Sequence, residues 1–160
     1  MVDRKMNGGF YYNNILWLSP AYQSLSKSSR NLLHCLVTEL RWTRKGKKKT
    51  YLNNGHLSFT EIAFKKRFGA VSMTYLKARN QLIEVGFIKQ THRGGHCRGD
   101  MSRYKILISN DVPEKHMRWL RYPQENWASD IPKVKSQIVG KETQWKKGKC
   151  ARKTKATLLK

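Results

Sequence analysis

The stretch from Ser58 to Ile88 reads SFTEIAFKKRFGAVSMTYLKARNQLIEVGFI and predicts a helix, a short turn, a longer helix and a strand. Ser58 followed three residues later by Glu61 is typical of a capping box, in which each side chain satisfies a backbone N–H group of the first helical turn. Gly69 is expected to end this first helix, because glycine tolerates the left-handed conformation. The apolar side of the helix is then formed by Ile62, Ala63 and Phe68.

The second helix of this stretch is expected to begin after an N-cap at Ser72 and to run to Val85. Gly86 then stops the helix, and the next two residues enter a strand at once. Apolar residues recur at helical spacing along one side of the helix. They are Tyr75, Ala78, Leu82 and Val85, with Leu76 and Ile83 beside them.

A β-hairpin is predicted after the second helix. Residues 90–102 are polar and rich in glycine, and beyond them Tyr104, Ile106 and Ile108 alternate with more polar positions. Two strands joined by a flexible basic tip at this place in the chain form what is called a wing. His56 and Leu57 are expected to add one or two residues of strand before the first helix of the pair.

Upstream of Ser58, Ser19-Pro20 predicts a short helix, because proline at the first helical position needs no N–H donor. Ser26 is the expected N-cap of a longer helix that runs to about Trp42. Residues 10–18 (FYYNNILWL) are expected to form an extended strand or a packing arm, and residues 41–49 (RWTRKGKKK) a basic loop.

These elements predict an α+β fold of the winged helix-turn-helix type, with a three-helix core and a β-hairpin wing in residues 1–111. Residues 112–160 are expected to form a basic, largely irregular tail, since prolines interrupt it and its aromatic residues follow no period. Two of those aromatic residues, Trp119 and Tyr122, either stay in the tail or pack back on the domain; the sequence leaves both alternatives open.

The charge of the chain points to a polyanionic partner. Its 160 residues include 33 Lys and Arg against 10 Asp and Glu, a formal net charge of +23. Such an excess repels itself unless a polyanion neutralises it, so nucleic acid is the first partner to consider. No apolar run approaches the roughly 18 residues of a membrane span, and the N-terminus lacks the apolar core of a signal peptide. Three scattered cysteines fit a reducing cytoplasm, with the protein on the nucleoid when bound to DNA.

Candidate DNA contacts fall into three groups. A helix that enters the major groove must expose polar side chains along its leading turns, and Lys suits guanine while Asn suits adenine. Glycine hinges at the wing tip let arginines reach a minor groove or a phosphate, and a basic loop adds phosphate contacts that position without specifying sequence. The recognition-helix candidates are Ser72, Met73, Thr74, Lys77 and Asn80; the wing candidates are Arg93, Arg98 and Arg103; the backbone candidates are Arg41, Arg44, Lys45, Lys47, Lys48 and Lys49.

The sequence contains little that indicates catalysis, metal binding or a cofactor. His92, His96 and Cys97 form an H-x3-H-C pattern, but a fourth ligand is missing and the spacing matches no usual zinc site. The acids are too few and scattered for a metal-dependent nuclease, and no phosphate-cradling loop or nucleophile–base grouping is present. We therefore expect a binding protein without a cofactor, not an enzyme.

The run LSPAYQSLSKSSRNLL, the segments LSFTEIAFKKRF and TYLKARNQLIEVGFI, and the final RYKIL resemble the winged-helix N-terminal domains of phage and plasmid replication proteins, of the bacteriophage replication protein O type. The resemblance covers roughly residues 10–108 and implies duplex DNA binding through the helix at residues 72–85, assisted by the wing. The basic residues 44–49 and the FGAVS link between the two helices depart from the family's pattern.

Replication initiation and transcriptional regulation are both compatible with this reading. The tail is a candidate to dock a protein partner through its aromatic residues. The alternative functions are an RNA- or ribosome-associated basic protein, and a phage-encoded inhibitor that docks on a host protein.

Overall fold

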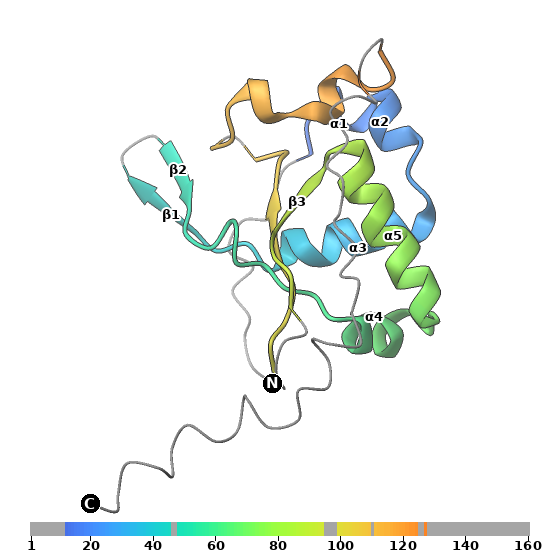
Figure 1. The fold of residues 1–160 in the computed structure, drawn as a ribbon. Helices are drawn as coiled ribbons and strands as arrows, with labels where there is room; N and C mark the ends of the chain where they lie inside the picture. Colours follow the sequence, from blue (N-terminus) through green and yellow to red (C-terminus); the bar gives the residue numbers. More distant parts are fainter. Residues whose placement is uncertain (1–11, 46–47, 95–98, 110, 125–126, 128–160) are drawn as a thin grey trace, which may run out of the picture.

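The computed structural model describes residues 12–45, 48–94, 99–109, 111–124 and 127 (Figure 1). Within these residues the chain forms five α-helices, two 3₁₀-helices and two separate two-stranded antiparallel sheets. The helices pack around one another, and the two hairpins extend from this helical body. The α+β class expected from the sequence is therefore confirmed.

Side-chain caps define where most of the helices begin. Asn13, Ser19, Ser26 and Thr60 each accept a hydrogen bond from a backbone N–H group in the first turn of the helix that follows. Ser26 is the cap that the sequence predicts, and Ser19 lies at the helix start expected from Ser19-Pro20. The helices are α1 (Asn14–Trp17), α2 (Pro20–Gln23), α3 (Lys27–Thr38), α4 (Glu61–Phe68) and α5 (Ser72–Val85).

Strands β1 (Trp42–Lys45) and β2 (Lys48–Tyr51) form one hairpin, and β3 (Ile88–His92) and β4 (Arg103–Ile106) form the other. The second hairpin is the one predicted after α5. Leu57 pairs with Tyr104 as an isolated bridge, which confirms the expected short strand before α4. Two 3₁₀-helices follow β4: η1 (Glu114–His116) and η2 (Arg118–Arg121).

The core lies where α3 crosses α5, with the β3–β4 hairpin closing one side (Figure 1). Leu33 and Leu36 of α3, Leu82 of α5 and Ile106 of β4 are completely buried. Phe87, also fully buried, joins the end of α5 to the start of β3. Burying apolar side chains at roughly 25 cal/mol per Å² makes this contact the main source of stability.

The segment from Asn53 to Leu57 connects three parts of the fold. The Asn53 side chain accepts a hydrogen bond from Arg41 N (2.7 Å) and donates one to Glu39 O (2.8 Å), which holds the chain just after α3. Asn54 makes an equivalent pair with the backbone of Ile106, accepting from N at 2.8 Å and donating to O at 3.1 Å. Leu57 exchanges backbone hydrogen bonds with Tyr104. This segment thereby ties α3, the entry to α4 and the β3–β4 hairpin together.

Gln81 fixes the rotation of α5 about its own axis. Its Oε1 accepts from Ser26 N (3.1 Å) and from the buried Ser29 Oγ (2.5 Å), and its Nε2 donates to Ser24 O (3.1 Å). All three partners lie at the junction of α2 and α3. One side chain of α5 therefore satisfies three polar groups there.

The prediction that Arg41–Lys49 forms a loop is wrong, because residues 42–45 and 48–51 pair as β1 and β2. Trp42 lies opposite Tyr51, and Thr43 opposite Thr50, so aromatic and β-branched residues pair at the base of the hairpin. These aromatic and β-branched side chains favour strands, so the neighbouring basic residues Arg44, Lys45, Lys48 and Lys49 also pair as strand residues.

Several predicted element boundaries are also corrected. The helix expected to run to Trp42 ends at Thr38, where Asn53 captures the following backbone. Thr60, rather than Ser58, caps α4, and Ile62 is 80% exposed because Phe64 is the residue that α4 buries. Residues 14–17 of the expected arm form α1.

The packed body continues past the domain edge expected at residue 111. Trp119 is buried, stacks on Phe87 with ring centroids 5.8 Å apart and donates from Nε1 to Leu107 O at 3.4 Å. Tyr122 is partly buried against the same core. Of the two alternatives for these aromatic residues, the structure shows the one in which they pack back on the domain.

Gly86 is the position where a side chain should be least tolerated. It ends α5 with φ of 92°, and an added Cβ would lie 2.6 Å from the Cβ of Arg118 and 3.3 Å from Trp119 N. We expect Gly86→Ala to lower the free energy of unfolding by about 2–4 kcal/mol in urea titrations, because strain and overlap add. Gly69→Ala is the matched control: φ is 62° and nothing lies within 4 Å, so about 1 kcal/mol is expected. Equal losses would contradict the close packing of η2 on the end of α5.

Candidate nucleic-acid interface

Helices α4 and α5 are held at a fixed angle by aromatic packing. Phe64 of α4 is 1% exposed, and its ring centroid lies 5.7 Å from that of Tyr75 on α5 and 6.4 Å from that of Phe59. Gly69 ends α4 in the left-handed conformation, and three residues later α5 begins. The short link and the aromatic contact together leave the outer side of α5 uncovered by α4.

The outer side of α5 carries most of the residues predicted to read bases. Met73, Lys77 and Asn80 follow one another at helical spacing and are all exposed, as is Ser72 at the first position of the helix. Thr74 is half-buried. The opposite side buries Tyr75, Ala78, Leu82 and Val85, as the helical spacing predicts.

Ser72 does not cap α5 as predicted. The N-cap is Val71, whose side chain accepts no hydrogen bond from the first turn, so Ser72 is the first residue inside the helix. The backbone turns into the helix one residue early, and Thr74 N and Tyr75 N both donate to Val71 O (3.0 and 3.3 Å). Among α1–α5, only α5 begins without a side-chain cap.

Arg79 is a candidate residue outside the predicted base-reading set; from its position in the helical pattern its side chain is expected only to extend toward the DNA backbone. It is half-buried, and its Nε and Nη2 donate to Asn80 Oδ1 at 3.2 and 3.0 Å. This bond orients the amide of Asn80 and brings a guanidinium beside it. Arg79 lies at the border of the apolar face in the helical pattern, so its place next to Asn80 depends on a rotamer that spacing alone does not specify.

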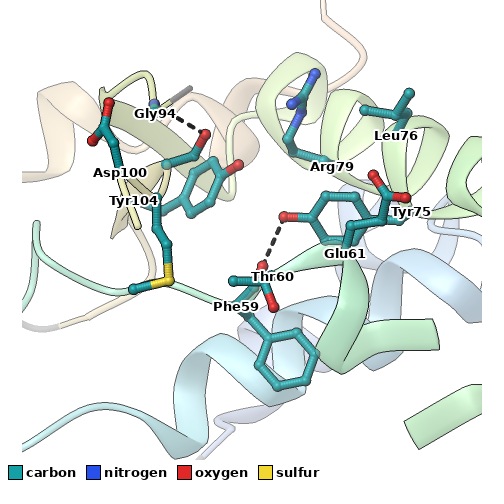
Figure 2. Close-up of a pocket in the computed structure, with 11 residues that line it drawn as sticks. Phe59, Thr60, Glu61, Tyr75, Leu76, Arg79, Gly94, Asp100 and Tyr104 are labelled. Atoms are coloured by element: carbon teal, nitrogen blue, oxygen red, sulfur yellow. Dashed lines mark hydrogen bonds between the residues drawn. The ribbon is translucent and has the colours of Figure 1, made fainter. Parts of the chain in front are cut away.

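A cleft of about 300 Å³ separates α5 from the β3–β4 hairpin (Figure 2). Tyr75 Oη donates to Phe59 O at 2.7 Å across its floor, and Gly94 N donates to Ser102 Oγ at 3.3 Å in its hairpin wall. Its lining comes from the entry to α4, from α5 and from the hairpin: Phe59, Thr60, Glu61, Tyr75, Leu76, Arg79, Gly94, Asp100, Met101, Ser102 and Tyr104.

Burial in this cleft raises the pKa of Tyr75 well above its usual value, and the neighbouring Tyr104 raises it further. The phenol is therefore a stable hydrogen-bond donor to the Phe59 carbonyl at neutral pH. This bond holds α5 against the entry to α4.

In the β3–β4 hairpin, His92 Nε2 lies 2.6 Å from Asp100 Oδ1, so the two sides of the hairpin are joined near its tip. The exposed Arg103 lies 3.3 Å from His56 through its Nη1, and Arg93 is half-buried. Arg98 lies outside the described residues, as do His96 and Cys97 of the H-x3-H-C pattern. Among the residues that the structure describes, no three His, Cys, Asp or Glu side chains gather as a metal site.

The basic candidates at residues 41–49 are placed only in part. Arg41 is exposed just before β1. Arg44 and Lys45 lie on β1, and Lys48 and Lys49 on β2, but the side chains of these four are outside the described part, as is the whole of Lys47. Figure 1 shows this hairpin extending away from α4 and α5.

The last turn of α4 exposes a basic cluster that the sequence reasoning missed: Lys65, Lys66 and Arg67. Cations at this end are favoured by the partial negative charge of the helix C-terminus. The consecutive KKR before Gly69 is visible in the sequence and is the signal that would have identified it.

Comparison with family models, with curated proteins and with solved structures finds no match to this chain. In the part of the chain that the structure describes, every helix is too short or too polar to cross a membrane.

We expect Tyr75→Phe to lower the free energy of unfolding by about 1 kcal/mol at pH 7, because the Phe59 carbonyl loses its donor. Below about pH 10, the ordinary pKa of tyrosine, the phenol is protonated in both folded and unfolded chains and its contribution is complete. Above that pH the unfolded chain loses the proton first, so the stability of the wild-type protein falls as pH rises, by up to about 1.4 kcal/mol per pH unit. Urea titrations from pH 8 to pH 11 should show a shallower fall for the variant; parallel curves would contradict the burial of this phenol.

Proposed function

We propose that this chain is a winged helix-turn-helix protein that binds double-stranded DNA, with α5 as the recognition helix and the β3–β4 hairpin as the wing. The observation that carries the proposal is the uncovered side of α5. Met73, Lys77 and Asn80 form an exposed stripe on a helix whose other side is anchored in the core. A rigid helix that presents a polar stripe is the element that fits a major groove.

The charge distribution along α5 supports this role. Glu84, in the last turn, is the helix's single acid, so the leading turns present no carboxylate to a DNA backbone. Lys77 can donate to guanine, and Asn80 can make a donor and acceptor pair with adenine. Arg79 holds Asn80 Oδ1 in the free protein, so base reading by Asn80 requires Arg79 to share or release that oxygen.

The start of α5 supports a phosphate contact. The first N–H groups of a helix carry partial positive charge and need acceptors, and Val71 supplies none from its side chain. A DNA phosphate near Ser72 would accept from these groups. The contact would place the leading turns of α5 over the groove.

Sequence-independent attraction comes from exposed cations around this surface. Lys65, Lys66 and Arg67 lie on the helix that precedes α5, and Arg103 lies on the wing. With a net charge of +23, the chain gains affinity by releasing counterions from DNA. We propose that the protein acts in replication initiation or transcriptional regulation in a phage or plasmid system. In this proposal it binds DNA without catalysing a reaction, and it lies in the cytoplasm, on the nucleoid when bound to DNA.

Substitutions on α5 and on α4 should separate base reading from phosphate contact. We expect Lys77→Ala and Asn80→Ala each to reduce discrimination between a selected duplex and a scrambled one by about 1–3 kcal/mol. Lys65→Ala and Lys66→Ala should instead weaken both duplexes alike and reduce the slope of log K against log salt by about one unit per lost contact. The measurement is fluorescence anisotropy over a salt series, with the selected duplex taken from a random pool.

Lys27→Ala on α3 provides the matched control, because Lys27 is an exposed lysine on another helix. Equal and sequence-blind losses from both groups would refute base reading by Lys77 and Asn80. An RNA hairpin bound as tightly as duplex DNA at physiological salt would refute the helix-in-groove proposal itself.

Changes at the basic hairpin test a further phosphate contact. We expect Lys47→Ala, Lys48→Ala and Lys49→Ala to lower affinity for all duplexes alike, with the same reduction in salt slope. The same anisotropy series measures this, and a change in preference between duplexes would contradict a role limited to phosphate.

A further inference from the structure

A second cleft, of about 380 Å³, lies on the other side of the β3–β4 hairpin from the cleft of Figure 2. Tyr104 lines the first cleft and Lys105 the second, as expected where successive strand residues point to opposite faces. The second cleft is enclosed by the hairpin, by the end of α5 and by the segment that contains η1 and η2.

The wall formed by η2 is packed firmly on the body. Arg118 Nη2 donates to Glu84 O at 3.1 Å, and the Arg118 Cβ is so close to Gly86 that no side chain fits between them. The neighbouring Trp119 is buried on Phe87 and bonded to Leu107 O. These contacts make the cleft a built feature of the fold, not a gap beside a loose segment.

The rim of this cleft is basic throughout. No Asp or Glu is among its lining residues, while the lysines Lys89, Lys105 and Lys115, with His116, Arg118 and Arg121, contribute to it. Lys89 and Lys105 lie directly opposite each other in the register of the hairpin. Like charges in that position destabilise a hairpin, so an anion bound between them would relieve the repulsion.

The floor is apolar. Ile83 at the end of α5, Leu107 just after β4, and Val112 line it. A ligand that fits must therefore present an apolar group to the floor and negative charge to the rim. The volume suits one or two large side chains, within the usual range for a binding pocket.

We propose that this cleft docks an acidic segment of a partner protein that carries an apolar anchor residue. Carboxylates of such a segment meet the lysines at the rim, while the anchor covers the floor. Duplex DNA is too wide to enter the cleft, and a single strand would find no Phe, Tyr or Trp in the lining on which to stack its bases.

The charge of the chain itself excludes its own copies and its own tail as occupants. Residues 128–160 contain only Asp130 and Glu142 as acids among many lysines and arginines, and a second copy brings the same net charge of +23. The complementary partner is therefore a different and acidic chain.

The test uses the full-length protein and a fluorescein-labelled peptide of about 12 residues, made of Glu and Asp around a central Leu-Phe pair. We expect Lys89→Glu to weaken peptide binding about tenfold by anisotropy at physiological salt, and the Lys89→Glu, Lys105→Glu double variant to weaken it further. Lys89→Glu should melt no lower than the wild type, because it turns a like-charge pair with Lys105 into an attractive one. Weaker peptide binding by this variant would then result from the lost charge in the cleft and not from unfolding of the protein.

Lys27→Glu is the matched control, since it makes the same charge change on α3, and it should weaken the peptide less than about threefold. A peptide with Ser-Ser in place of Leu-Phe should bind several-fold more weakly to the wild type. The proposal fails if the two peptides bind with equal affinity, or if Lys27→Glu weakens peptide binding as much as Lys89→Glu does. It also fails if a 12-nucleotide oligothymidine binds more tightly than the peptide and Lys89→Glu weakens that binding. Loss of peptide binding by Lys89→Glu while duplex DNA binding persists would set this site apart from the α5 surface.

Discussion

The fold depends on the five residues from Asn53 to Leu57, which satisfy backbone groups in three elements that are distant in sequence. Asn53 bonds the chain after α3, Asn54 bonds both backbone groups of Ile106, and Leu57 exchanges hydrogen bonds with Tyr104. Buried backbone groups need such partners, so these bonds determine where the β3–β4 hairpin lies relative to the helices. The position of α4, and through it of α5, follows from where this segment leaves the hairpin.

Much of the helical part of the fold could be predicted from local sequence. Ser19 and Ser26 cap helices because the caps act on N–H groups within the next turn, and Gly69 and Gly86 end helices with positive φ. The predictions of Ser58 and Ser72 as caps are wrong for a common reason. A capping side chain acts where the backbone enters the helix, and the burial of Phe64 and Tyr75 determines at which residue each helix begins. The β1–β2 hairpin was not predicted because the many lysines and arginines of residues 41–49 indicate a loop. The pairing of Trp42 with Tyr51, which favours strands, joins residues on both sides of the basic residues 44–49.

The candidate site could be predicted only where it depends on helical spacing. The exposed stripe of α5 follows from the positions of its buried residues, but the cleft beside it combines α5 with hairpin residues some 25 positions further along the chain. The bond between Arg79 and Asn80 is a choice of rotamer that spacing does not determine. The second cleft was hidden for a related reason, since it exists only because η2 folds back onto Gly86. The hairpin thus presents one surface beside the exposed helix and another, more basic one, on its opposite face.

The side chain of Gln81 is committed to the packing of α5, whereas the stripe of Met73, Lys77 and Asn80 is exposed to solvent. The three bonds of Gln81 at the α2–α3 junction fix the azimuth of the helix from a position one turn beyond Lys77, at the edge of this stripe. Exposed positions that carry no packing contacts tolerate substitution with little change in stability. The stripe can therefore diversify during evolution while the scaffold stays constant. Proteins built on this backbone can differ at this exposed surface without having to fold differently.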